Sequence, residues 1–112
     1  VTRTIRIKDS LVIRIVDLLG NFDKLPNLYH QIQTILKQED AEYIDCLNFG
    51  ISEDIFAQLG FVKLAVDGEV IIPTYFEPYE RKNHVIEFAC KTTKPYMIFK
   101  GDSDQDRPNI IA

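Results

Sequence analysis

The stretch "LVIRIVDLLGNFDKLPNLYHQIQTILKQEDAEYIDC", from Leu11 to Cys46, decides the fold. It begins with an apolar run that suits a central strand covered on both faces. Apolar residues at helical spacing follow: Leu25, Leu28, Tyr29, Ile32, Ile35 and Leu36. Pro26 fits the first turn of that helix, and an apolar run over 42–49 reads as the next strand. A strand–helix–strand crossover joins parallel strands of one sheet, so we expect a mixed, partly parallel sheet.

The flanking sequence extends this unit into one mixed α/β (α+β) domain with two helices, over residues 1–112. Alternating apolar and charged residues before Asp9-Ser10 predict a hairpin with the central strand. Ser52 and Gly60 have the positions of an N-cap and a C-terminal stop around a short helix. Asp67-Gly68 is typical of a tight turn and predicts a hairpin over 61–72. Segments 85–91 and 95–100 predict a last pair of strands joined by a turn over 92–94.

Composition bounds the function only loosely. The chain has 112 residues, 13 basic and 17 acidic side chains and a net charge of -4, which argues against nucleic acid or an anionic membrane surface as partner. No apolar run approaches the roughly 20 residues of a membrane span, and no secretory signal pattern begins the chain. We therefore expect a cytoplasmic protein. Because the sequence starts with Val1, we also expect a processed protein or a piece of a longer chain.

The thiols and imidazoles do not form a recognisable metal or redox motif. Cys46 and Cys90 lie in apolar, strand-like runs, so we expect two reduced, buried thiols, with a disulfide between neighbouring strands as the alternative. Cys/His zinc spacing is absent. His30 falls off the apolar stripe of its helix and is expected on the surface. No metal cofactor is expected.

"CLNFGISEDIFAQLGF", Cys46 to Phe61, resembles the C-terminal half of the GNAT superfamily of acyl-CoA N-acyltransferases. Residues 11–61 follow the family's order of elements up to Leu59-Gly60-Phe61, and 85–100 would supply its final strands. The resemblance covers about two thirds of this chain and implies a GNAT-like C-terminal half fold. The same stretch also fits a plain amphipathic helix running into a strand.

The resemblance implies a site for acetyl-CoA or another acyl-CoA between the central strand and its helix. There it assigns phosphate binding to Leu19, Gly20, Asn21 and Lys24. The family's glycine-rich loop is reduced to Gly20, and Asp23 adds negative charge. The tyrosine that serves the family as general acid corresponds to Phe56, which has no proton to donate. An asparagine that also belongs to the family's pattern corresponds to Phe49 in this chain, and Asn48 is the adjacent residue. No catalytic residue is assigned.

The acidic C-terminal stretch "KGDSDQDRPN" leaves three interpretations open. Asp102, Asp104 and Asp106 match the first, third and fifth positions of a calcium loop, but Arg107 replaces the required glycine and the chain ends before the twelfth position, so an EF-hand is excluded. The carboxylates can accept backbone hydrogen bonds in turns. Alternatively, they bind an amine or sugar substrate with Arg107 as the anion partner, or they bind a metal ion.

Two further features have a structural and a functional interpretation. "IIPTYFEPYERKN", residues 71–83, gathers aromatics between prolines and suits either a cap over the core or a surface for sugars or proteins. Asp45 interrupts an apolar strand. It is either a carboxylate facing water, which we favour, or a buried carboxylate near a site.

The sequence therefore predicts an acyl-CoA N-acyltransferase-like domain. It would act on an amine of a sugar or amino-acid metabolite as part of a larger protein. The alternative is a non-catalytic binding or oligomerisation module with a degenerate acyltransferase fold. An exposed sheet edge would then pair with a second copy or with the N-terminal half of a parent chain.

Overall fold

The computed structural model describes residues 1–73 and 80–102. Its elements are β1 (Thr2–Ile7), β2 (Ser10–Ile15), the 3-10 helix η1 (Phe22–Leu28), α1 (Tyr29–Gln38), β3 (Tyr43–Cys46), β4 (Asn48–Phe49), α2 (Glu53–Gln58), β5 (Ile98–Phe99) and the 3-10 turn η2 (Lys100–Asp102). The fold is therefore mixed α and β, as the sequence predicted.

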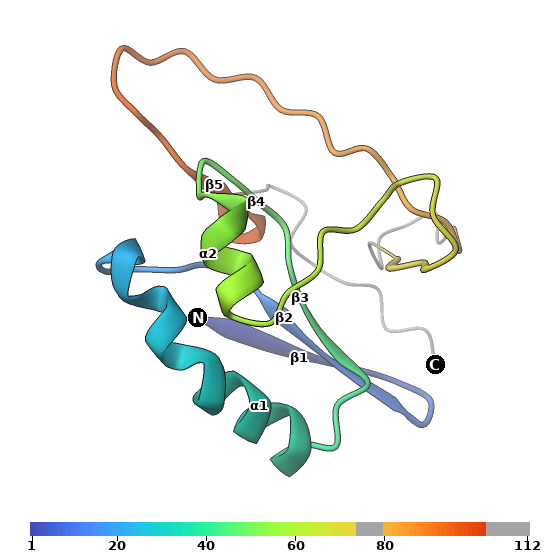
Figure 1. Cartoon of the computed structure of the whole chain (residues 1–112). Helices are drawn as coiled ribbons and strands as arrows, with labels where there is room; N and C mark the ends of the chain where they lie inside the picture. Colours follow the sequence, from blue (N-terminus) through green and yellow to red (C-terminus); the bar gives the residue numbers. More distant parts are fainter. Residues whose placement is uncertain (74–79, 103–112) are drawn as a thin grey trace.

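The main sheet has three strands in the order β1-β2-β3, with β1 antiparallel and β3 parallel to β2. The crossover through η1 and α1 that joins β2 to β3 confirms the predicted parallel pair (Figure 1). Every residue of β2 after Ser10 is buried, as expected for a strand covered on both faces. The central strand thus supplies more buried apolar residues than any other described element: Leu11, Val12, Ile13 and Ile15.

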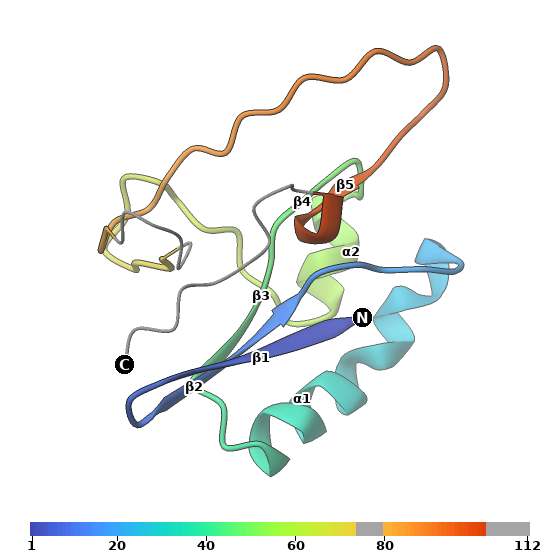
Figure 2. The ribbon, with the colours of Figure 1, turned by 180° about the vertical axis from the view of Figure 1, so that it is seen from behind.

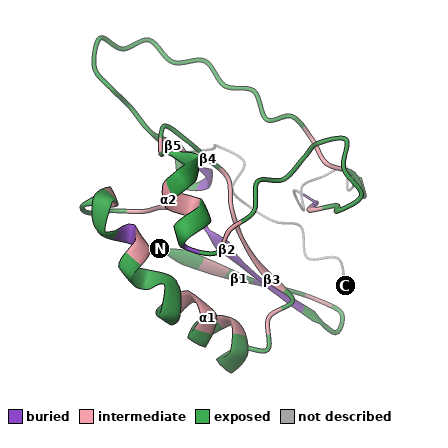
Figure 3. Cartoon of the chain, viewed as in Figure 1, coloured by how far each residue is buried: buried purple, intermediate pink, exposed green. Residues whose placement is uncertain are grey.

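The helices lie together on one side of the main sheet (Figures 1 and 2). Asn21 caps η1, and its side chain accepts a hydrogen bond from the backbone N–H of Asp23. The predicted helix begins as this 3-10 helix because Pro26 lies inside it, and the α-helix starts only at Tyr29. No residue of α1 is fully buried (Figure 3).

The short helix α2 follows its sequence signals closely. Ser52 caps it by accepting from the N–H of Asp54 at 3.2 Å. Gly60, with a φ of 87°, follows it in the left-handed conformation that glycine tolerates best. Leu59 between them is buried, so the helix end is fixed against the core.

The predicted strand over 42–49 divides into two parts that serve different sheets. β3 stays with the main sheet, whereas β4 pairs antiparallel with β5. A Cβ at Gly50 would lie 2.5 Å from the carbonyl oxygen of Tyr96, so the chain can pass here only without a side chain. β5 and η2 bring Phe99 into the core and the N–H of Gly101 to the carbonyl of Val16 at 2.7 Å.

The predicted strands between α2 and β5 are wrong. A turn forms one residue earlier than predicted: the N–H of Gly68 bonds to the carbonyl of Ala65, which makes Val66 and Asp67 its central residues, and its arms form no ladder among the described residues. Residues 84–97, here called the arch, run as an extended segment away from the rest of the fold (Figures 1 and 2). Only Ile98 and Phe99 of the predicted last pair of strands are paired, with β4 and not with 85–91.

Candidate functional site

A buried ion pair joins the two parallel strands at the centre of the sheet. Arg14 on β2 lies beside Asp45 on β3 in the strand register. Its Nε donates to Oδ1 at 2.8 Å and its Nη2 donates to Oδ2 at 2.6 Å. Arg14 is 2% exposed and the side chain of Asp45 is 12% exposed. The expectation that Asp45 faces water is therefore wrong, because its carboxylate neutralises a guanidinium inside the fold.

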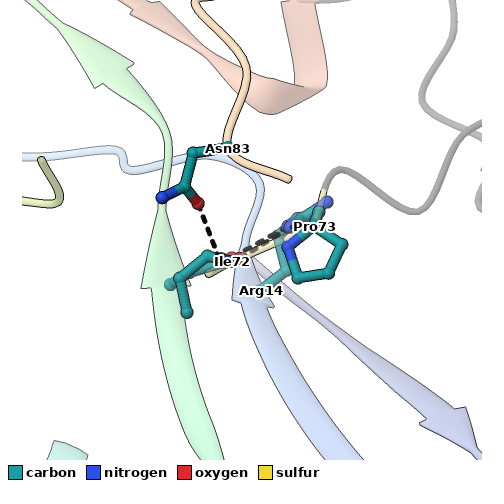
Figure 4. A network of polar contacts seen from close by, with 5 residues as sticks. Arg14, Ile72, Pro73 and Asn83 are labelled. Carbon is teal, nitrogen blue, oxygen red and sulfur yellow. Dashed lines mark hydrogen bonds and ion pairs between the residues drawn. The ribbon is translucent and has the colours of Figure 1, made fainter. Parts of the chain in front are cut away.

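The same guanidinium also holds a distant loop. Nη2 of Arg14 donates to the carbonyl of Pro73 at 3.3 Å, and this contact is buried (Figure 4). Neither Arg14 nor Asp45 is thereby presented to a substrate. A charged pair with this fork geometry orders the strand pair and the segment that ends at Pro73.

Asn83 forms a second connection close to this pair. Its Oδ1 accepts from the N–H of Ile72 at 2.8 Å (Figure 4). Its Nδ2 donates to the carbonyls of Val70 at 2.7 Å and Ala65 at 3.3 Å. One side-chain amide thus replaces the cross-strand bonds expected around Asp67-Gly68. We call Asn83 with these three partners the Asn83 clasp. Sequence reasoning could not predict this clasp, since no local pattern around a loop asparagine indicates its distant partners.

The predicted phosphate loop lies at the carboxyl end of β2, where open sheets commonly bind ligands. Leu19 is 83% exposed, and Gly20 has a φ of 120° with open space where a Cβ would project. Asn21, however, uses the local donors: its side chain accepts from the N–H of Asp23, and its carbonyl accepts from the N–H of Lys24 at 3.1 Å. The first turn of η1 therefore has fewer free N–H groups than a phosphate cradle needs.

Phe56, which corresponds to the tyrosine of the resembled family, and Asn48, which lies next to the position of its asparagine, both make local contacts. The ring of Phe56 meets that of Phe61 edge to face, with centroids 5.6 Å apart. Asn48 donates from Nδ2 to the carbonyl of Cys46 at 3.2 Å, within its own turn of chain. Neither residue has a partner suited to proton transfer among the described residues.

Of the acidic C-terminal cluster, only Asp102 lies within the described residues. Its Oδ2 accepts from the N–H of Phe99 at 2.8 Å, which is the turn-forming role considered for these aspartates. Asp104, Asp106 and Arg107 lie outside the described residues, as do Tyr75, Phe76 and Tyr79 of the aromatic loop. Binding of an amine or sugar substrate, or of a metal ion, by this cluster stays a prediction.

An exposed aromatic cluster joins the arch to the small sheet, and sequence analysis missed it. Phe49 of β4 meets Phe88 edge to face at 5.1 Å and stacks on Tyr96 at 5.7 Å. Phe88 and Tyr96 meet edge to face at 6.3 Å. All three residues are exposed, at 50%, 44% and 38%. A cluster of this kind is typical of a surface that binds an apolar or aromatic partner.

The two thiols differ sharply in environment. Both are free cysteines, but Cys90 is exposed, so its predicted burial is wrong. Cys46 is half-buried, and burial together with the adjacent carboxylate of Asp45 raises the pKa of its thiol to about 12. The Cys46 thiol is therefore protonated at neutral pH and is a poor nucleophile.

The rest of the described surface, over residues 1–73 and 80–102, was considered for metal-binding groups, membrane-spanning helices and pockets. There, no group of three or more His, Cys, Asp or Glu side chains is arranged to hold a metal ion. No helix of this part of the chain could cross a membrane. A shallow, open hollow on the outer face of α1 is lined by His30, Gln31, Thr34 and Ile35. His30 is exposed there, as predicted.

Comparisons of the sequence with models of protein families, with curated proteins and with solved structures find no match. The acyltransferase resemblance therefore stays a prediction from the residues that carry it.

Proposed function

We propose that this chain is a non-catalytic binding and assembly module with an acyltransferase-like half fold. The observation that carries this proposal is the exposed aromatic cluster of Phe49, Phe88 and Tyr96 beside the unpaired arch. Apolar rings on an extended segment with open backbone edges favour the addition of a strand from a partner. A cytoplasmic location is part of the proposal, and the two free thiols support it.

The occupied donors at the predicted phosphate loop favour this function over catalysis. Asn21 uses two backbone N–H groups that a pyrophosphate would otherwise bind. Phe56, at the position of the general acid, has no ionisable group. Binding and assembly require neither an anion cradle nor an acid.

Sedimentation velocity of the purified chain over a wide concentration range tests the proposal. We expect a reversible increase in sedimentation coefficient with concentration, which Phe88→Ser weakens. Leu19→Ser provides a matched control, because Leu19 is an exposed apolar residue outside the cluster. A folded chain that stays monomeric up to millimolar concentration, and captures no partner through Phe88, contradicts the assembly function.

A second candidate function is binding of acetyl-CoA or another acyl-CoA, for transfer to an amine of a sugar or amino-acid metabolite. It is favoured by the position of the loop over 19–24 at the carboxyl end of a strand that has a parallel neighbour. Calorimetric titration with acetyl-CoA and with free coenzyme A tests it. Micromolar binding that Lys24→Glu abolishes and Lys37→Glu preserves would support this function. No heat at millimolar ligand would exclude it.

A further inference from the structure

The arch contains an extended segment, residues 85–91, whose backbone edges have no neighbouring strand among the residues that the structure describes. None of its residues takes part in a backbone–backbone hydrogen bond with another described residue. Every one of its residues is exposed, including Val85 at 69% and Ile86 at 53%. β-branched and aromatic residues of this kind favour a paired strand. The segment therefore has the composition of a strand but lacks a neighbouring strand.

Alternation divides this segment into two faces. Ile86, Phe88 and Cys90 share one face, because side chains alternate along an extended chain. Phe88 fixes this face against Phe49 of β4 and Tyr96. The other face carries two opposite charges, Glu87 and Lys91, and within the described part of the chain neither has an ion-pair partner.

We propose that residues 87–91 of this segment pair antiparallel with the same residues of a second copy, about a two-fold axis that passes through Ala89. This proposal rests on the assembly function proposed above and names the surface that performs it. In this register Ala89 lies opposite itself, and Glu87 lies opposite Lys91 of the second copy. Because the axis makes the interface symmetric, the charge pair forms twice. Phe88 lies opposite Cys90, so the two aromatic clusters lie on the same face of the new strand pair.

The charges select this register over its neighbours. An axis through Glu87 or Lys91 would set identical charges directly opposite each other, which is unfavourable. An axis through Phe88 or Cys90 would set both Glu87 and Lys91 opposite uncharged residues of the second copy. An axis between two residues would set Ile86, Phe88 and Cys90 of one copy opposite the other face of its partner, which carries Glu87 and Lys91, so the two apolar faces would not lie on the same side.

Charge reversal tests the pairing. Glu87→Lys or Lys91→Glu turns two attractive cross-strand pairs into two repulsive ones, and we expect about tenfold or greater weakening of self-association for each. The double variant Glu87→Lys/Lys91→Glu restores opposite charges in the same register and should recover self-association. Circular dichroism of each variant confirms that the chain is folded. Because all these positions are exposed, the substitutions leave the core intact.

Disulfide cross-linking tests the register. Cα atoms directly opposite in an antiparallel pair lie about 4.5–5.5 Å apart, within the range of a disulfide. In a Cys90→Ala background, Ala89→Cys should form a covalent dimer under mild oxidation, and Val85→Cys, which lies opposite Thr93, should not. Failure to cross-link, together with self-association that survives both charge reversals, would overturn the proposed pairing and leave the assembly function standing. A folded chain that is monomeric at every concentration would overturn both.

Discussion

Replacing Asp45 by Asn isolates the contribution of the buried ion pair. The substitution keeps the shape of the side chain and removes its charge. Arg14, 2% exposed, then retains a guanidinium whose charge is no longer neutralised by the adjacent carboxylate. Breaking a buried pair from one side typically costs about 3–5 kcal/mol, because the remaining charge stays desolvated. The amide oxygen of Asn can still accept one hydrogen bond, so we expect about 3 kcal/mol.

That loss is a large share of the stability of a small domain, which is about 5–15 kcal/mol. With an m-value of about 1.5 kcal/mol per M in urea, the unfolding midpoint should fall by about 2 M. Urea titration followed by far-ultraviolet circular dichroism measures it. The loop should loosen too, because Arg14 also donates to the carbonyl of Pro73. Faster hydrogen exchange at the N–H of Ile72 would report this loosening.

Two controls make the result interpretable. Glu53→Gln removes one charge of the exposed pair between Glu53 and Lys63, and it should cost about 0–1 kcal/mol. The double variant Arg14→Met/Asp45→Leu removes both buried charges and should lie much closer to the unsubstituted protein than Asp45→Asn does. A loss below about 1 kcal/mol for Asp45→Asn would refute the reasoning, since it would mean that water reaches the guanidinium.

Three further predictions concern other parts of the fold. Gly50→Ala should lower the free energy of unfolding in urea by about 2 kcal/mol more than Gly20→Ala does. Both glycines have positive φ, but only a Cβ at Gly50 would meet a backbone carbonyl. Equal losses of stability would contradict this contact. Asn83→Ala should speed hydrogen exchange at the N–H of Ile72 at least tenfold, while unchanged exchange would argue against the Asn83 clasp. Iodoacetamide at pH 8 should alkylate Cys90 quickly and Cys46 only in denaturant. Folding raises the pKa of the Cys46 thiol from 9.0 to about 12, so the folded state disfavours the thiolate. The contribution of this thiol to the free energy of unfolding is therefore fully present below pH 9 and is lost as the pH rises toward 12. Cys46→Ala should reduce the decline in stability over that pH range.

The elements that sequence analysis predicted correctly are those whose signals are local. The crossover from β2 to β3 follows from a long apolar run, a helical stripe and a second apolar run. The boundaries of α2 follow from Ser52 and Gly60, which act within one turn of the chain. The burial of β2 on both faces could also be read from its near-continuous apolar run.

The elements that were wrong depend on distant partners. Apolar alternation over 85–91 shows that these residues could form a strand, but it does not say which strand would pair with them. A turn forms near Asp67-Gly68, but it is centred one residue earlier, and the carbonyls of Ala65 and Val70 on either side of it accept from Asn83, a residue far along the chain. Of the candidate site, the buried pair had a usable signal: Arg14 and Asp45 are charges in neighbouring apolar strands, and the parallel register sets them side by side.

The Asn83 clasp has a consequence for how this protein can change over evolutionary time. By binding the N–H of Ile72, Asn83 closes the chain on both sides of residues 74–79. Segments enclosed in this way can gain or lose residues at small thermodynamic cost, since each doubling of loop length adds only about 0.6 kcal/mol of closure entropy. After an insertion between Pro73 and Asn83, the hydrogen bonds from Arg14 to the carbonyl of Pro73 and from Ile72 to Asn83 would still hold both ends of the interrupted chain against the sheet.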